Sequence, residues 1–242
     1  MIKEKNFFAA ILLAAGKSRR FSYKNIKKQF LRFKDKTLIE YVLDKFLKVS
    51  SIKQFLLVVP KEDFKKTEKI LSKYKDINLQ MVIGGKERCN SVANAVKFLD
   101  KNIDYVLVHD VARPFVSVDL IKRCIEKIKN CDCVIPAINV SDTVKMINSN
   151  SEVIKTLDRE NLVLVQTPQI FKTSVLKKIY SDEILNKWTK KKKITDDAQL
   201  AELEGYKVKV IEGEKQNFKI TTKEDLYFIK LLTINYELST IN

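Results

Sequence analysis

Small residues and cations stand together near the start of this 242-residue chain, in a pattern suited to holding phosphates. Ala14, Ala15 and Gly16 follow an apolar run, and their small side chains would let backbone N–H groups approach a phosphate or a base edge closely. Arg20 and Lys28 are spaced so that both can converge on the same anion. The pattern favours an anion-binding loop, and a plain basic surface loop is the alternative.

Two familiar phosphate-binding motifs are excluded for this loop. A P-loop needs a glycine five positions before Gly16, where Ile11 stands. The GxGxxG dinucleotide fingerprint needs further glycines that the loop lacks. What remains is a run of small residues at the end of a strand, followed by two arginines.

Four later segments also carry polar or charged residues, three of them directly after apolar runs and the last one before a predicted helix. Residues 84–91 (GGKERCNS) begin with two glycines, which permit positive φ angles and a close backbone approach, and open a helix whose N-terminus attracts anions. Residues 109–114 (HDVARP) place Asp110 at a strand end, the position of a metal or hydroxyl ligand in a parallel sheet. Pairing of Asp110 with Arg113, to cap the loop, is the structural alternative. The other two segments are 166–169 (QTPQ) and 217–222 (NFKITT).

Apolar runs alternate with helical patterns along most of the chain, and this alternation predicts the elements that position the loops. The runs are nearly continuous, as in parallel strands covered on both faces. We therefore expect one α/β domain over residues 1–242, with a doubly wound, mostly parallel sheet and helices on both faces. The predicted strands are 7–13, 54–59, 79–83, 105–109, 133–137, 162–166 and 207–211. The predicted helices are 37–49, 61–74, 88–99, 118–130, 173–186, 196–204 and 223–232.

Residues 139–160 break this alternation. They hold two short β-like pieces, 143–147 and 153–157, around an Asn- and Ser-rich turn, which predicts a β-hairpin. A projecting hairpin can pack on a second subunit, and a surface flap is the alternative.

The formal net charge is +16, from 46 Lys and Arg against 30 Asp and Glu. Such an excess first suggests a partner that carries phosphates. Only seven of these basic residues are arginine, however, and the lysines are scattered over predicted helix faces. A protein that binds duplexes would use arginine for bidentate contacts, so we expect no nucleic-acid partner.

The four cysteines and the single histidine do not form a metal-binding pattern. Cys89, Cys124, Cys131 and Cys133 show no CxxC spacing, and His109 is far from them, so no zinc site is expected. Scattered thiols are typical of the reducing cytosol, so we expect a cytoplasmic protein.

The N-terminal apolar run resembles a signal peptide, because Lys3 and Lys5 precede it. Glu4 is unusual for such a leader, and the first loop motif begins inside the run. We interpret the run as the first strand. At about ten residues it is too short to span a bilayer, and no membrane partner is expected.

Taken in order, these motifs resemble those of the 2-C-methyl-D-erythritol 4-phosphate cytidylyltransferase family, which has the nucleotide-diphospho-sugar transferase fold. The similarity covers nearly the whole chain, in the family's order. The matching stretches are LAAGKSRRF (13–21), KKQFL (27–31), GGKERCNSV (84–92), VLVHDVARPF (106–115), VSDTVK (140–145), TLDRENL (156–162), QTPQIF (166–171), TDDAQL (195–200) and NFKITTKEDL (217–226). Ribitol-5-phosphate cytidylyltransferases share part of this set and are the alternative, although residues 157–159 and 88–92 look more like the methylerythritol branch.

The resemblance implies a role for each matching residue. The implied catalytic residues are Arg20, Lys28, Arg159 and Lys219. The implied CTP-binding residues are Ala14, Ala15, Gly16, Gly85, Lys86 and Ser91. The implied acceptor-binding residues are Asp110, Arg113, Thr143 and Thr167. It also implies Mg²⁺, held mainly by the CTP phosphates with Asp110 as a further contact, and a homodimer whose 139–160 arm brings Thr143 and Arg159 to the partner's site.

The implied reaction transfers CMP from CTP to methylerythritol phosphate and releases pyrophosphate, a step of non-mevalonate isoprenoid precursor synthesis. The attacking phosphate oxygen is already an anion at neutral pH, so no general base is required. Fixed cations aimed at the α-phosphate would lower the barrier. A basic nucleic-acid-binding module is the alternative from another class, but it leaves the anion-binding loops unexplained.

Overall fold

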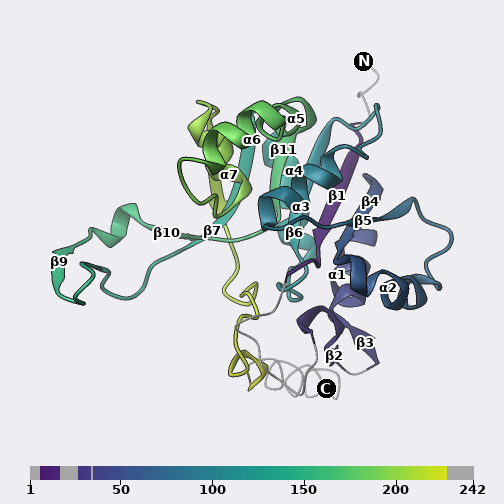
Figure 1. The fold of residues 1–242 in the computed structure, drawn as a ribbon, viewed down its shortest axis with the longest axis horizontal. Coiled ribbons are helices and arrows are strands. Elements are labelled where there is room, and N and C mark those ends of the chain that lie inside the picture. The colour runs from purple at the N-terminus through teal and green to yellow at the C-terminus, as the bar shows by residue number, and fades with distance from the viewer. Residues whose placement is uncertain (1–5, 17–26, 34, 228–242) are drawn as a thin grey trace.

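A computed structural model describes residues 6–16, 27–33 and 35–227 of the chain. An eight-stranded sheet runs through its centre, in the order β10-β7-β11-β6-β1-β4-β5, with β12 also paired to β7 (Figure 1). The strands are β1 (Phe8–Leu13), β4 (Ile52–Val59), β5 (Leu79–Ile83), β6 (Tyr105–Asp110), β7 (Cys133–Asn139), β10 (Val163–Val165), β11 (Gln169–Lys172) and β12 (Val208–Glu212). Strands β1, β4, β5 and β6 pair in parallel, whereas β10 and β11 run antiparallel to their neighbours.

Helices cover both faces of the sheet. They are α1 (Leu38–Leu47), α2 (Phe64–Leu71), α3 (Arg88–Val96), α4 (Val118–Ile128), α5 (Thr173–Ile179), α6 (Asp182–Thr189) and α7 (Asp197–Leu203). Helices α1 and α4 pack with Ala10 and Leu12 of β1 in one buried cluster. Helices α3, α5 and α7 pack with Ile11 and Leu13 of the same strand in another. Because both sets of alternating side chains of β1 are apolar, the strand is stable only with a helical layer on each side.

Local sequence fixes where several helices begin. The Thr37 hydroxyl accepts the Glu40 amide while the Glu40 carboxylate accepts the Thr37 amide, a capping box that starts α1. The Ser117 and Ser181 hydroxyls cap α4 and α6 in the simpler way, and the Asp196 carboxylate caps α7. Each cap replaces a hydrogen bond that the first turn of a helix lacks.

The doubly wound α/β architecture is confirmed, and most predicted elements are found within a few residues. Strand β11 was not predicted. Its four residues begin at the last residue of the QTPQ segment, and no helix separates it in the sequence from the preceding strand β10. The predicted helix 173–186 is wrong as one element, since Ser181 starts a new helix there. Within the predicted helix 223–232, residues 225–227 are helical, and residues 228–232 lie outside the described residues.

Two short hairpins and three 3-10 turns complete the described part of the chain. A short hairpin of β2 (Arg32–Phe33) and β3 (Lys36–Thr37) lies before α1, and single 3-10 turns form η1 (Lys28–Phe30), η2 (Lys61–Asp63) and η3 (Arg159–Asn161). The second hairpin is the one predicted in 139–160, which is confirmed as β8 (Lys145–Ile147) and β9 (Val153–Thr156). Its turn is organised by Asn148, whose side-chain oxygen accepts the amides of Asn150 and Glu152. The hairpin projects from the body of the molecule as an arm (Figure 1).

Candidate active site

The candidate site lies at the carboxyl ends of the parallel strands, where ligands bind in open α/β sheets. Residues 14–16 follow β1, residues 84–87 follow β5, and Asp110 is the last residue of β6. Residues 166–168 and 217–222 approach the same edge from later parts of the chain. These are the segments in which the sequence predicted anion-binding chemistry.

The first two loops touch at a point that only glycine allows. A Cβ atom added to Gly84 would lie 2.5 Å from the Ala15 Cβ, and one added to Gly85 would lie 2.4 Å from the Asn90 Cβ. The glycines are needed for this close approach rather than for positive φ, because among the described glycines only Gly205 has a positive φ. Of the two uses that the sequence allowed for these glycines, the structure shows the close approach and not the positive φ.

Several implied CTP-binding groups also shape their own loops. The Ser91 hydroxyl accepts the Gly85 amide at 3.0 Å and donates to the Glu87 carbonyl at 3.0 Å, which closes the 84–87 loop over the start of α3. The Ala14 amide donates to the Val58 carbonyl at 2.8 Å and so continues the hydrogen bonding between β1 and β4. Lys86 is exposed to solvent.

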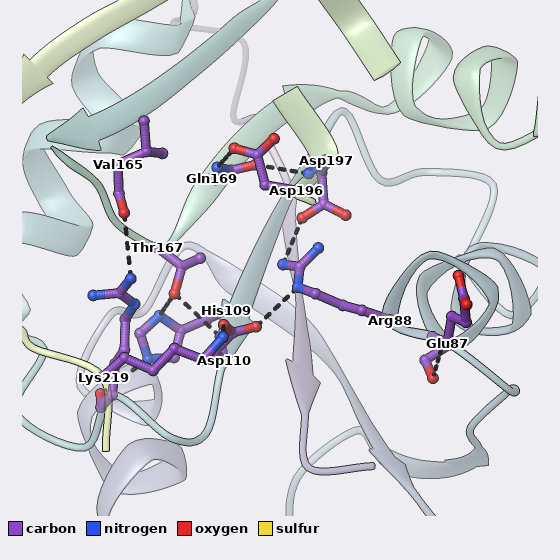
Figure 2. Close-up of polar contacts among 12 residues, drawn as sticks. Glu87, Arg88, His109, Asp110, Val165, Thr167, Gln169, Asp196, Asp197 and Lys219 are labelled. Atoms are coloured by element: carbon purple, nitrogen blue, oxygen red, sulfur yellow. Dashed lines mark hydrogen bonds and ion pairs between the residues drawn. The ribbon is translucent and has the colours of Figure 1, made fainter. Parts of the chain in front are cut away.

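Asp110 holds two cations in a buried position (Figure 2). Its Oδ1 accepts from Arg88 Nε at 3.1 Å and its Oδ2 accepts from Lys219 Nζ at 2.5 Å. Burial alone would raise the pKa of Asp110, but the charges of Arg88 and Lys219 and the Lys219 hydrogen bond hold that pKa well below its ordinary value. The carboxylate is therefore ionised at any physiological pH. The alternative considered from the sequence, an ion pair of Asp110 with Arg113, is not found, because Arg88 and Lys219 pair with the carboxylate.

A hydrogen-bonded chain behind Asp110 fixes its backbone. The Asp110 amide donates to Thr167 Oγ1 at 3.1 Å, and the Thr167 hydroxyl lies 3.0 Å from His109 Nδ1. The other ring nitrogen, Nε2, lies 3.2 Å from the Arg113 carbonyl oxygen, which can only accept. Nε2 therefore carries the proton, and Thr167 donates to Nδ1. Thr167 follows strand β10 and precedes Pro168 through a cis peptide bond.

Cations from the C-terminal loop and from η1 meet at the same edge. Lys28 Nζ donates to the Ile220 carbonyl at 2.9 Å, next to Lys219. Arg113 Nη1 donates to the Asn217 carbonyl at 2.8 Å, whereas its buried Nε has no hydrogen-bond partner in the part of the chain that the structure describes. Burial lowers the pKa of Arg113 from its ordinary value, and its charge remains in place. A buried donor of this kind is suited to an anionic ligand.

An open cavity of about 410 Å³ lies among these groups. Its lining contains three cations together with carboxylates, amides and hydroxyls, a composition suited to a polar phosphate ester. The lining residues are Arg88, Asp110, Arg113, Val165, Gln166, Thr167, Gln169, Thr195, Asp196, Gln199, Glu202 and Lys219.

The structure thus gathers some of the predicted site residues and separates others. Asp110, Arg113, Thr167 and Lys219 line the cavity, and Lys28 is tied to the backbone beside Lys219. Arg20 lies outside the described residues.

Thr143 and Arg159 are not among the residues that line this cavity. Thr143 precedes β8 and Arg159 begins η3 after β9, so they stand at the two ends of the arm hairpin. The Arg159 Nη1 atom instead donates to the Ser141 carbonyl at 2.8 Å. If these two residues act at a cavity of this kind, the cavity belongs to another copy of the chain.

Sequence reasoning missed Arg88 and the acidic start of α7. Arg88 joins Asp110 to Asp197 across the site, and Gln169 Nε2 donates to Asp196 Oδ2 at 2.7 Å within the cavity lining (Figure 2). Arg88 lies in the matching stretch GGKERCNSV, and Asp196 and Asp197 lie in TDDAQL. The sequence therefore contained these residues within family motifs, but the resemblance implied no function for them. Their pairing became visible only in three dimensions.

Burial of His109 makes stability depend on pH in a range where few other groups titrate. Burial lowers the pKa of His109 to about 3, far below its ordinary value of 6.5. Below pH 6.5 the unfolded chain therefore binds a proton at His109 that the folded chain does not bind. The full contribution to stability is present above that pH, and the free energy of unfolding decreases as the pH falls below it. We expect the free energy of unfolding to be about 2 kcal/mol lower at pH 5 than at pH 7.

Urea unfolding at the two pH values measures this difference. His109 is the only histidine in the chain, so its replacement by glutamine should remove most of the slope between pH 7 and pH 5. An equal slope in His109→Gln would assign the effect to carboxyl groups.

The sheet, the small-residue loop after its first strand and the cation-lined cavity at its carboxyl edge together define a nucleotidyltransferase. Comparison with known proteins narrows this class. The family model described as 2-C-methyl-D-erythritol 4-phosphate cytidylyltransferase matches residues 8–233, and the chain belongs to this family.

Individual relatives agree with the family match. A 2-C-methyl-D-erythritol 4-phosphate cytidylyltransferase of Thermosipho melanesiensis is 42% identical over 224 residues, which cover 91% of this chain and 95% of the relative. The crystal structure of 4-diphosphocytidyl-2C-methyl-D-erythritol synthase from Anaerococcus prevotii superposes with a TM-score of 0.82 at 33% identity, covering 95% of this chain and 96% of that one. The corresponding Francisella tularensis enzyme gives a TM-score of 0.77 at 31% identity, with 93% and 99% covered.

Proposed function

We propose that this enzyme transfers CMP from CTP to 2-C-methyl-D-erythritol 4-phosphate, giving 4-diphosphocytidyl-2-C-methyl-D-erythritol and pyrophosphate in non-mevalonate isoprenoid precursor biosynthesis. Family membership over residues 8–233 supports the reaction. The observation that carries it is the cavity at the sheet edge, where Asp110 is held between Arg88 and Lys219. Arg88 is the first residue of α3, directly after the loop 84–87, and it pairs with Asp110 at the cavity. This ion pair therefore connects the loop expected to hold the nucleotide with the cavity expected to hold the acceptor.

In this proposal, fixed cations provide most of the catalysis. The acceptor phosphate would lie against Arg113, whose buried Nε has a hydrogen to donate. Lys219 and Lys28, which are joined through the backbone at 219–220, would face the α-phosphate and the leaving pyrophosphate. As negative charge shifts toward the pyrophosphate, pre-positioned cations stabilise it without having to reorganise. Because the attacking oxygen is an anion, the neutral and buried His109 has no proton to remove.

Mg²⁺ is proposed to enter with CTP rather than to reside on the protein. Both carboxylate oxygens of Asp110 already accept from cations, so this side chain does not offer an open ligand in the arrangement described. Among the described residues, no three His, Cys, Asp or Glu side chains are grouped as metal ligands would be. Mg²⁺ commonly binds nucleotide phosphates with few protein ligands, and it would supply further positive charge there.

The arm points to a homodimer. Its apolar side chains are exposed although they are the kind that normally face a partner: Ile147 is 55% exposed, Val153 60% and Ile154 61%. Thr143 and Arg159 on the same arm lie away from the cavity of their own chain. We therefore propose that each arm packs on a second copy and brings these two residues to that copy's acceptor.

Mixed dimers test this arrangement. Arg159→Ala should raise the KM for the acceptor more than the KM for CTP. If the arm acts on the partner, mixing Arg159→Ala with Lys219→Ala creates dimers in which one site is fully intact, so about a quarter of the wild-type activity should return in an equal mixture. If the arm serves its own chain, every site carries a defect, and the mixture stays as inactive as its components.

We propose a cytoplasmic location. The four cysteines are all present as free thiols, three of them buried, as in proteins of a reducing compartment. In the described part of the chain, no helix is long and apolar enough to cross a membrane.

Pyrophosphate release from CTP and Mg²⁺ tests the function directly. Methylerythritol 4-phosphate and ribitol 5-phosphate serve as parallel acceptors, and release is expected with the first alone. Release with ribitol 5-phosphate alone would keep the mechanism and overturn the acceptor. Release with neither acceptor would overturn the proposed reaction.

A further inference from the structure

A buried acid outside the cavity forms an ion pair with Arg88, one of the cations that line the cavity. Asp197 begins helix α7 and is fully buried, and it does not belong to the cavity lining. Its Oδ2 lies 2.7 Å from Arg88 Nη2, while its Oδ1 accepts the hydroxyl hydrogen of Tyr180, which is also buried. The Asp197 amide donates to Gln169 Oε1 at 3.1 Å. Asp197 is thus held by two hydrogen bonds, through its Oδ1 and its amide, and by one ion pair through its Oδ2.

The guanidinium of Arg88 is held from two sides. Its Nη2 pairs with Asp197 and its Nε pairs with Asp110, so the group bridges one carboxylate behind the cavity and one at its edge (Figure 2). Charges then alternate from Asp197 to Arg88, Asp110 and Lys219. Burial works against the charge on Arg88, but the two carboxylates outweigh it and raise the pKa of Arg88.

Stability alone is a poor explanation for such a row of charges. A buried ion pair costs much of its attraction in lost hydration, and well-packed apolar side chains would stabilise the fold as well or better. The row of charges instead fixes the orientation of the Arg88 side chain, because a guanidinium paired at both ends cannot rotate without breaking a buried contact.

We propose that Asp197, oriented by Tyr180, is a positioning residue for the transfer reaction: it fixes Arg88 and, through Arg88, the carboxylate of Asp110 at the acceptor cavity. The inference rests on the proposed acceptor-binding role of Asp110. The loop 84–87 is held separately by Ser91 and by the close approach of Gly84 to Ala15. Loss of Asp197 therefore disturbs the acceptor side of the site and leaves the nucleotide loop in place.

Tyr180→Phe is the mildest test, because it removes one oxygen and keeps the ring. The expected result is about a tenfold lower kcat/KM for the acceptor, with the KM for CTP within twofold of wild type. Tyr74→Phe is the matched control: the Tyr74 hydroxyl donates to Asp44 Oδ1 at 2.8 Å, on the other side of the sheet from Tyr180. An equal loss of kcat/KM in Tyr74→Phe, or equal losses for both substrates in Tyr180→Phe, would overturn the inference.

A double-mutant cycle tests the path through Arg88. Asp197→Asn alone should lower the acceptor kcat/KM by about 10²-fold, since small displacements of positioning groups can cost that much. In an Arg88→Gln background the same change should have almost no further effect, because the group it positions is gone. Independent, multiplying effects would show that Asp197 does not act through Arg88. If Asp197→Asn does not fold, the cycle is run with Tyr180→Phe in its place.

A spectroscopic measurement separates this inference from the proposed function. The Arg88 Nε–H, held at 3.1 Å from Asp110, should give a slowly exchanging side-chain signal in ¹⁵N NMR of the wild-type protein. That signal should shift or broaden in Tyr180→Phe and stay unchanged in Tyr74→Phe. An Arg88 signal that does not respond to Tyr180→Phe would overturn the positioning role even in an active enzyme, whereas inactivity of the wild type would overturn only the proposed reaction.

Discussion

Lys28→Ala should lower kcat by about 10²–10³-fold, the loss found when one pre-positioned transition-state donor is removed. Lys28 Nζ donates to the Ile220 carbonyl, which places its charge beside Lys219 at the cavity edge. The cation is expected to act on the triphosphate only as charge develops, so the KM for CTP should change much less than kcat. Steady-state kinetics with CTP and methylerythritol 4-phosphate measures both values.

Lys27→Ala is the control for this variant. Lys27 is the preceding residue, but its Nζ pairs with Glu62 at 3.1 Å and with Asp63 at 2.8 Å, away from Ile220. Its removal should leave kcat within threefold and cost at most about 1 kcal/mol of stability, as for a partly exposed ion pair. If Lys28→Ala kept a kcat similar to that of Lys27→Ala, Lys28 would have no part in the transfer step.

Lys219→Ala should cause a second loss of about 10²–10³-fold in kcat, for the same electrostatic reason. Its side chain is 36% exposed and its Nζ lies 2.5 Å from Asp110 Oδ2, so the charge is both anchored and accessible to a ligand. Asp110 keeps Arg88 as a partner in this variant, and the fold should therefore survive. Circular dichroism and thermal unfolding would verify that the variant is folded before its rate is measured.

Lys223→Ala provides the comparison for Lys219→Ala. Lys223 is an exposed lysine four residues further along the chain, so its removal changes the net charge equally without touching Asp110. Its kcat should stay close to that of the wild type. A similar decrease in both variants would mean that the general positive field of the loop matters, and that the contact with Asp110 does not.

The parts of this molecule that could be predicted are those specified by neighbouring residues. The continuous apolar runs predicted β1, β4, β5 and β6, and the Asn-rich turn predicted the arm hairpin, because each depends on local pattern. Strand β11 escaped because a four-residue strand inserted antiparallel between β6 and β7 leaves no periodicity to detect.

The site was predicted as a set of loops but not as a set of contacts. Asp110 and Lys219 were both expected to act, yet the ion pairs of Arg88 with Asp110 and with Asp197 join residues far apart in sequence, and no local pattern encodes them. Sequence also suggested that Asp110 pairs with Arg113, the nearest cation. The fold instead offers Asp110 two cations that point directly at its oxygens, and the closer geometry prevails.

The contact of Lys28 with Ile220 spans 192 positions of the chain. It has a consequence for biosynthesis on the ribosome, where residues emerge in order at about 5–20 per second. Strands β1, β4, β5 and β6 can associate as soon as residue 110 has emerged, but the partners that residues 217–222 supply arrive only near the end of translation. A nascent chain can therefore complete much of its parallel sheet well before its active site, and catalytic competence should be among the last properties it acquires.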